Sequence, residues 1–312
     1  MQITASMVKE LREVTGAGMM DCKKALAEVD GDMEKAVDYL REKGLAGAQK
    51  KAGRIAAEGI VMNLVSEDQK HAVTVEVNAE TDFVAKNEKF RAYVEEVAAQ
   101  ILNSDVENVE TFLTQPWTLD PSLTVEQKLS EMISVIGENM RIRRFEKVNA
   151  ENGFVASYIH GGGKIGVLVK VESDVFNEEL REMARNIAMQ IAALRPQFCS
   201  DAEVPADFVE KETEILRAQI DNDPKEMNKP EKVKEGMIRG RLQKELKEVC
   251  LMDQIYVRAE DGKQIVKDYV AQTAKANGAN LKIVSFTRFE TGEGLEKRNE
   301  DFAAEVAKQI NH

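Results

Sequence analysis

Cysteine is rare in this sequence, and its spacing excludes the sites that cysteine usually builds. The three cysteines, Cys22, Cys199 and Cys250, are far apart and odd in number. Zinc sites and disulfide frameworks need closely or regularly spaced cysteines. We therefore expect three reduced thiols, as in a cytoplasmic protein.

Long apolar segments are also absent. No run of about 18 apolar residues is present, so we expect no membrane span. The first residues, MQITASMVKELREVTG, lack the basic start and apolar block of a signal peptide. Both observations favour a cytoplasmic location without membrane binding.

Positive charge is in deficit. The chain has 43 Lys and Arg against 55 Asp and Glu, a net charge of −12. Phosphate contacts need clustered Lys and Arg, so we expect no direct nucleic-acid binding. The one basic stretch without acids, residues 43–54, fits either a surface for an acidic partner or a solvated linker.

A catalytic constellation is missing as well. His71, His160 and His312 have no motif partners. The run Gly161-Gly162-Gly163-Lys164 invites a phosphate-loop interpretation, but a phosphate loop leads into a helix. Here the run leads into the apolar alternation of a strand, so a hairpin turn is expected. We expect no catalytic residue, no metal site and no cofactor.

An internal repeat is the clearest feature that is present. Residues 59–77, GIVMNLVSEDQKHAVTVEV, align without a gap on residues 153–171, GFVASYIHGGGKIGVLVKV. Each copy predicts a hairpin with a five-residue turn, followed by a helix at 90–101 or 180–191. The first copy has four more residues between hairpin and helix. This pattern predicts an α+β fold with two duplicated antiparallel sheet–helix subdomains.

The remaining segments read as helices. Residues 3–44 predict a bundle of three short helices of the ubiquitin-associated type, with the third ending at Gly44. Two charged amphipathic helices around a Pro-containing turn predict a helical-hairpin arm. A last helix is expected from Asp301 to Ile310. The expected division is a bundle at 1–45, a partly helical linker at 46–58, core subdomain N at 59–148, core subdomain C at 149–204 and 250–290, the inserted arm at 205–249, and a C-terminal helix module at 291–312.

The four extra residues fall in a polar loop, Asn78 to Asn87, that contains Phe83 beside Asp82. Loops on rigid scaffolds often carry function. From spacing alone, the opposite interpretation is open: Phe83 folds back onto the core, and Thr81 or Asn87 caps the next helix. Two interpretations are likewise left for His160: a structural residue of the turn or a residue that contacts a partner.

Three segments together carry a resemblance. They are TGAGMMDCKKAL at residues 15–26, EVNAETDFVAKN at 76–87 and YIHGGGKIGVLV at 158–169. With them, the chain resembles bacterial translation elongation factor Ts over almost its whole length. One departure is visible, because residues 103–123 look longer than in the compact form of that family.

The resemblance implies a guanine nucleotide exchange factor whose partner is the GTPase elongation factor Tu. It implies that the loop Thr81, Asp82, Phe83 and Val84 dislocates the partner's Mg²⁺, and that the bundle and first subdomain hold its GTPase domain. It implies further contacts from His160 in the second subdomain and from Lys9, Arg12, Met19, Met20 and Lys23 in the bundle. The arm is left with two roles, self-association with another copy or contact with the partner.

Two rivals remain at the level of sequence. The bundle alone would fit a ubiquitin-like-binding protein, but that leaves the repeat and the arm unexplained. An enzyme with a cryptic site in the hairpin repeat would need a titratable cluster, which the sequence does not display.

Overall fold

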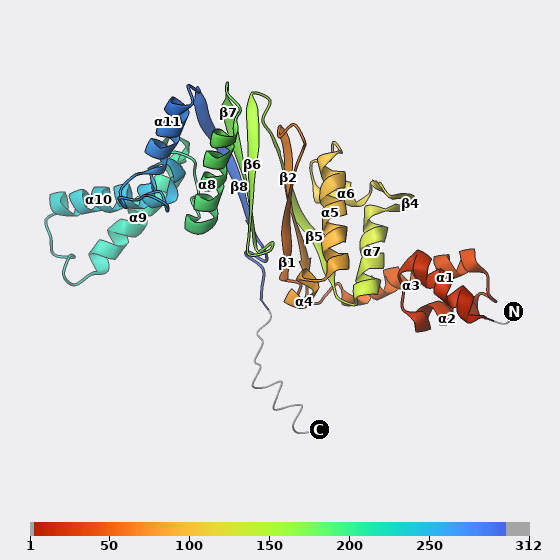
Figure 1. Cartoon of the computed structure of the whole chain (residues 1–312). Coiled ribbons are helices and arrows are strands. Elements are labelled where there is room, and N and C mark those ends of the chain that lie inside the picture. The colour runs from red at the N-terminus through yellow and green to blue at the C-terminus, as the bar shows by residue number, and fades with distance from the viewer. Residues whose placement is uncertain (1–2, 298–312) are drawn as a thin grey trace.

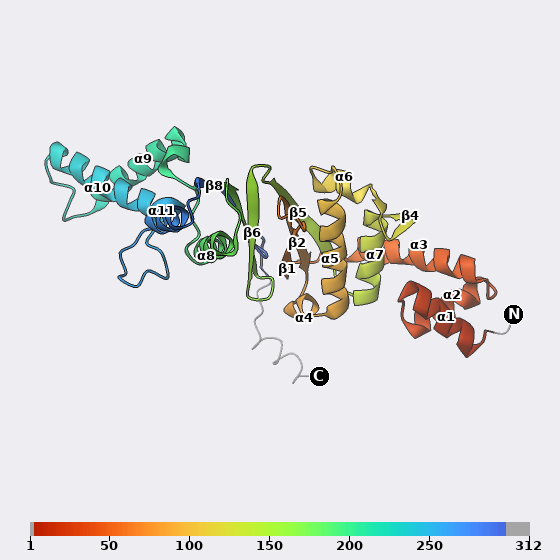
Figure 2. The ribbon, with the colours of Figure 1, turned by 45° about the horizontal axis from the view of Figure 1, so that its top comes forward.

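The computed structural model describes residues 3–297 as a mixed α/β chain with small antiparallel sheets. Figure 1 shows an elongated molecule, with a helical bundle at the N-terminal end, two sheets in the middle and a helical hairpin at the far end. Figure 2 shows the same order of layers after a turn of 45°. The helix expected from Asp301 to Ile310 lies outside the described residues.

Capping residues set the starts of two helices in the N-terminal bundle. Thr4 accepts a hydrogen bond from the backbone N–H of Met7, and Asp32 accepts one from that of Lys35. Such caps satisfy donors that have no partner inside the helix. Leu11 and Leu26 are fully buried in the centre of the bundle. The helices are α1 (Ala5–Thr15), α2 (Met19–Glu28) and α3 (Met33–Lys51).

The expected end of the third helix at Gly44 is wrong. Helix α3 continues to Lys51, through much of the segment expected to be a linker. A Cβ at Gly44 would lie 3.8 Å from the Cβ of Ser134, so the glycine lies close to another helix. Ala and Lys are strong helix formers, which explains why the chain stays helical after Gly44.

The first sheet is three-stranded, with strand order β1-β2-β5. Apolar residues such as Val73, Val75 and Val77 are fully buried on β2 and pack with the helix that follows. The segment 103–123 adds a short helix and a small hairpin, which bury Phe112 and Trp117. The elements of this unit are β1 (Glu58–Val65), β2 (His71–Ala79), α4 (Asp82–Ala85), α5 (Glu88–Leu102), α6 (Val109–Leu113), β3 (Pro116–Trp117), β4 (Asp120–Thr124), α7 (Val125–Ile136) and β5 (Met140–Asn149).

The second sheet, with strand order β6-β7-β8, repeats the first in register. Gly59 pairs with Asn78 in the first hairpin, and Gly153 pairs with Glu172 at the matching place in the second. The register shift at Glu76/Val77 recurs at Lys170/Val171. The elements are β6 (Gly153–His160), β7 (Ile165–Ser173), α8 (Glu178–Leu194), α11 (Val266–Ala276) and β8 (Leu281–Glu290).

The two sheets face each other, and the helices cover their outer sides (Figure 1). Asn63 on β1 donates from its amide to Ser157 and to the carbonyls of Tyr158 and Val167. Glu76, with no exposed surface, accepts hydrogen bonds from Arg143, from Arg144 and from the N–H of Gly292, which follows β8. A side-chain amide and a buried carboxylate therefore both join the sheets.

The arm consists of α9 (Ala206–Asn222) and α10 (Glu231–Val249). Its helices pack around their own small core of Leu216, Ile220 and Ile238. At the base, the carbonyl of Val249 accepts from the N–H groups of Gln197 and Phe198. Short 3₁₀ turns flank the arm at Asp201–Glu203 and Leu251–Asp253.

Candidate partner-binding surface

The loop that carries Phe83 is held at its start by one carboxylate. Glu138, which follows α7, accepts hydrogen bonds from the N–H groups of Glu80 and Thr81 at 3.1 and 3.0 Å. It also accepts one from the Thr81 hydroxyl at 2.7 Å. A carboxylate that accepts several hydrogen bonds fixes the groups that donate them. The start of the loop is therefore clamped to the first sheet unit.

The extra residues of the first copy form the single-turn helix α4. Thr81 caps it by accepting from the N–H of Val84, and Asn87 caps the following α5. Asp82 pairs with Lys86 at 2.7 Å across the turn. The hydrogen bond from Lys86 is the main reason that the pKa of Asp82 is lowered, and the charge of Lys164 adds to it. Asp82 is therefore ionised at neutral pH, and its pairing is lost only as pH falls through that lowered pKa.

Phe83 and Val84 point in different directions. Phe83 is 80% exposed, whereas Val84 is buried in the first core. The alternative in which Phe83 folds back onto the core is therefore wrong, although the expected caps at Thr81 and Asn87 are both present. Val84 anchors α4 and leaves the aromatic ring in solvent. A large exposed aromatic on an anchored turn is a typical contact feature.

His160 lies at the end of β6, where the second hairpin turns. Its Nδ1 is 3.0 Å from the hydroxyl of Tyr158, and its side chain is exposed. Gly161, Gly162 and Gly163 have φ of 59°, 68° and 112°, and strand β7 follows them. Backbone in that region favours glycine, so the run is a hairpin turn and not a phosphate loop. Arg91 connects this turn to α4 by donating to Gly162 and to Ala85.

The five bundle residues that the resemblance implies as partner contacts are all exposed: Lys9, Arg12, Met19, Met20 and Lys23. Met19 and Met20 begin α2 with 59% and 74% of their surfaces exposed. The bundle lies at the N-terminal end and α4 lies below the first sheet (Figure 1). Because Arg91 bonds both to α4 and to the turn that follows His160, His160 lies near the α4 loop. The five bundle residues form a separate group.

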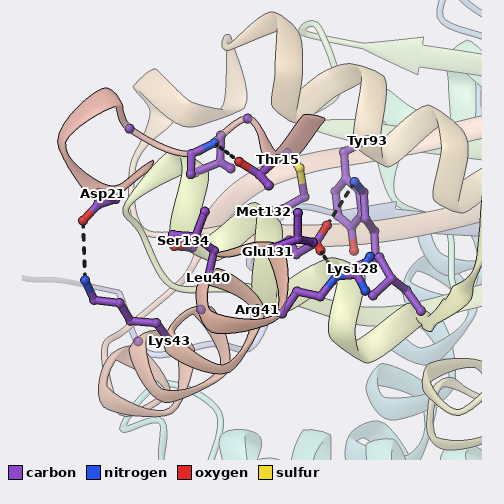
Figure 3. Close-up of a pocket in the computed structure, with 18 of the residues that line it drawn as sticks. Thr15, Asp21, Leu40, Arg41, Lys43, Tyr93, Lys128, Glu131, Met132 and Ser134 are labelled. Atoms are coloured by element: carbon purple, nitrogen blue, oxygen red, sulfur yellow. Dashed lines mark hydrogen bonds and ion pairs between the residues drawn. The ribbon is translucent and has the colours of Figure 1, made fainter. Parts of the chain in front are cut away.

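A cavity of about 740 Å³ lies between the bundle and the first sheet unit (Figure 3). Arg41 on α3 makes ion pairs with Asp120 at 3.5 Å and with Glu131 at 3.6 Å, and Lys128 also pairs with Glu131. The cavity is lined by six Lys and Arg side chains and four Asp and Glu side chains, so these ion pairs neutralise only part of its positive charge. Their geometric effect is to link α3 to β4 and α7, which fixes how the bundle is attached.

Titratable chemistry is sparse in the described part of the chain. Across residues 3–297 the side chains form no group of three or more His, Cys, Asp or Glu that could hold a metal. Burial raises the pKa of Cys199 to about 12 and that of Cys250 to about 11, and it also raises that of Cys22. The thiolate is the reactive form of cysteine, so these thiols are poor nucleophiles. None of the helices described is long and apolar enough to cross a membrane.

Two residues that organise the surface, Glu138 and Arg91, were not expected from the sequence. Glu138 bonds to Thr81 across 57 positions, and Arg91 bonds to Gly162 across 71. Neither lies in a motif, and local patterning gives no signal for such distant contacts.

Comparison with known proteins places the chain in a family. The family model described as Elongation factor TS matches residues 80–293. Elongation factor Ts of Clostridium novyi (strain NT) is 52% identical over 309 residues, 99% of both chains. Those of Clostridium tetani (strain Massachusetts / E88) and Clostridioides difficile (strain 630) are 50% and 51% identical, again with 99% of both chains covered. The chain therefore belongs to the elongation factor Ts family of translation elongation factors.

Proposed function

We propose that this protein is a guanine nucleotide exchange factor for elongation factor Tu, which binds the GDP-bound GTPase and promotes GDP release during translation elongation. Membership of the elongation factor Ts family supports the partner. One structural observation carries the mechanism: Phe83 stands 80% exposed on a turn anchored by Glu138 and Val84. The role needs only binding, so no catalytic residue and no cofactor are required.

In the proposed mechanism the loop disturbs the partner's Mg²⁺ site. A GTPase holds its nucleotide mainly through phosphate charge paired with Mg²⁺, Lys and backbone donors. Of the four residues Thr81 to Val84, Asp82 and Phe83 are exposed and would enter that region. Thr81 and Val84 support the same step indirectly. Thr81 caps α4, and Val84 anchors α4 in the core.

Exchange by this route is a negative coupling between two ligands of the GTPase. We call the exposed part of this loop, Asp82 and Phe83, the wedge. If the wedge weakens nucleotide binding to the GTPase, bound nucleotide must weaken binding of the wedge by the same factor. An acceleration of about 10⁴ lowers the barrier by roughly 5.5 kcal/mol, at about 1.36 kcal/mol per decade. Burial of one aromatic side chain contributes about 1.5–3 kcal/mol. Phe83 alone is therefore too small, and other contacts must hold the wedge in place.

The other contacts are assigned to the bundle and to the second hairpin. Met19 and Met20 offer flexible apolar surface, and Lys9, Arg12 and Lys23 add exposed positive charge on the same bundle. His160 offers a contact on the second sheet unit. The sets lie on different units of an elongated molecule (Figure 2), which suits a protein that grips its partner at several places.

The proposal includes the expected division into bundle, two related core subdomains, arm and C-terminal segment. The repeated hairpin register and the separate arm core support it. The exchange activity would take place in the cytoplasm, without direct contact with nucleic acid or membrane. For the arm, pairing with another copy is kept as the alternative to contact with the partner.

The reciprocal coupling gives a direct binding test. The affinity of this protein for elongation factor Tu is measured by calorimetry with the GTPase free of nucleotide and again with saturating GDP. We expect the nucleotide-free form to bind at least a hundredfold more tightly. Equal affinity for the two forms would contradict an exchange role, because a ligand without differential affinity shifts no equilibrium.

A further inference from the structure

Arg91 links two elements that are far apart in the sequence. Its Nη1 donates to the carbonyl of Ala85, the last residue of α4, at 3.2 Å. The same nitrogen donates to the carbonyl of Gly162, in the turn between β6 and β7, at 3.0 Å. One guanidinium therefore bridges the loop of the first sheet unit and the hairpin of the second.

The hairpin side of this bridge is rigidly seated. The carbonyl of Gly163 accepts from the N–H of Val61 on β1 at 2.7 Å. A Cβ on Gly163 would lie 2.9 Å from the Cβ of Ile60, so the turn packs closely on the first sheet. Thr291 also donates to the carbonyl of Gly163. The neighbouring carbonyl of Gly162 is thus presented to Arg91 from a fixed support.

The loop side has the opposite character. Helix α4 is a single turn, and Glu138 holds only its start. Phe83 lies between that clamp and Ala85, with its ring in solvent. Without Arg91, the end of α4 would keep only its local bonds and the packing of Val84 and Ala85 on the first core. The charge of Lys164 acts on Asp82, which is further evidence that the loop and the turn are close together.

We propose that Arg91 is a positioning residue for nucleotide exchange, which sets the spacing between Phe83 on α4 and His160 on the second hairpin. This proposal rests on the proposed exchange function. Arg91 lets both groups meet the partner in one step, because a preorganised surface avoids the entropy cost of ordering the loop during binding. Its carbonyl partners lie near the surface, where water can replace the lost bonds. Its loss therefore affects exchange much more than folding.

The first test uses Arg91→Ala and Arg91→Lys in the full chain. We expect Arg91→Ala to lower the maximal rate of labelled GDP release from elongation factor Tu about tenfold, with little change in melting temperature. Arg91→Lys should recover part of the rate, because an ammonium can still donate to the two carbonyls. Lys89→Ala, which removes an exposed cation two residues away on the same helix, is the matched control and should match the wild type. An unchanged maximal rate in Arg91→Ala would overturn the proposal.

A double-mutant cycle separates positioning from direct contact. If Arg91 acts through the loop, adding Arg91→Ala to Phe83→Ala should slow exchange no more than about twofold beyond Phe83→Ala alone, since coupled residues are non-additive. If Arg91 instead contacts the partner independently, the two effects should multiply, and the positioning role is wrong.

Hydrogen exchange tests the same claim without the partner. Arg91→Ala should speed exchange of the amides of residues 84–87 in the free protein, and Lys89→Ala should not. Unchanged protection in Arg91→Ala would overturn the positioning role. If the wild type fails to accelerate GDP release while this protection pattern is found, the proposed function fails and the structural role of Arg91 stands.

Discussion

At the scale of single residues, Phe83 and Val84 show how neighbours divide a task. Val84 is buried in the first core, and Phe83 exposes 80% of its surface. Thr81 faces Glu138, and Asp82 is tied to Lys86 within the turn. The result is a short helix that is stable enough to present one aromatic ring, although that ring contributes nothing to the core.

Phe83→Ala should therefore separate activity from stability. A core Phe cut to Ala costs about 3–5 kcal/mol of folding stability, but an exposed Phe should cost close to nothing. We expect an unchanged melting temperature and slowed GDP release, with a smaller effect on binding to the nucleotide-free partner, because a wedge acts mainly in the strained complex that still holds nucleotide. Thermal melting beside a fluorescent-GDP release assay measures both. A sharply lowered melting temperature with normal release per folded molecule would refute the wedge.

At the scale of elements, the two hairpins have the same register, and each has a glycine at the matching position near the start of its first strand. A Cβ on Gly59 would lie 2.2 Å from the carbonyl oxygen of Val77, and one on Gly153 would lie 1.9 Å from that of Val171. No side chain fits at either place without movement of the backbone. The repeat therefore preserves a steric requirement of the strand pair.

Gly59→Ala and Gly153→Ala should each lower the free energy of unfolding by about 2–3 kcal/mol, because the backbone must shift. Gly236→Ala is the matched control in the middle of α10, where an added Cβ meets nothing within 4 Å. It should leave the core unaffected and stabilise the arm helix by about 0.5–1 kcal/mol. Urea denaturation measures all three variants. Equal effects at the three positions would show that the close approach in the hairpins is unimportant.

The arm should be separable from the core. Its helices enclose their own apolar cluster, but its base contacts the core through Phe208, whose ring meets that of Phe198 edge-on, and through Val249. Replacement of residues 212–244 by a Gly-Ser link should therefore leave one cooperative melting transition. The full chain is the control. If the shortened chain unfolds without cooperativity, the arm is part of the core.

Local signals predicted most of the elements and few of the contacts between them. Thr4, Asp32 and Asn87 mark helix starts because capping is a short-range interaction. Gly44 was wrongly expected to end α3, since a glycine that allows helix packing looks the same in sequence as a glycine that ends a helix. The positions of Phe83 and His160 were predictable from family motifs. The supports from Glu138 and Arg91 were not, because they depend on tertiary contacts.

At the scale of the whole molecule, buried charge fastens the second sheet unit to the first. Glu76 on β2 has no exposed surface and accepts from Arg143, Arg144 and the N–H of Gly292. Arg144 also packs over the ring of Phe289 on β8, 4.2 Å from its centroid. The far end of β8 and the first sheet are thus joined through one carboxylate.

Glu76→Ala should destabilise the protein by about 3–5 kcal/mol, because its removal leaves the largely buried guanidinium of Arg143 without a partner carboxylate and the N–H of Gly292 without an acceptor. Glu67→Ala, in the exposed turn of the first hairpin, removes the same charge in solvent and should change stability by less than about 0.5 kcal/mol. Chemical denaturation gives both values. Similar small effects in the two variants would mean that the cluster does not hold the sheets together.

The activity of the whole molecule is tested most directly by the release of labelled GDP from elongation factor Tu. The release rate is followed after addition of excess unlabelled GDP, with increasing amounts of this protein. We predict that the rate rises with its concentration to a plateau at least a thousandfold above the spontaneous rate, and that Phe83→Ala lowers the plateau. A release rate that stays at the spontaneous value at every concentration would contradict the exchange function.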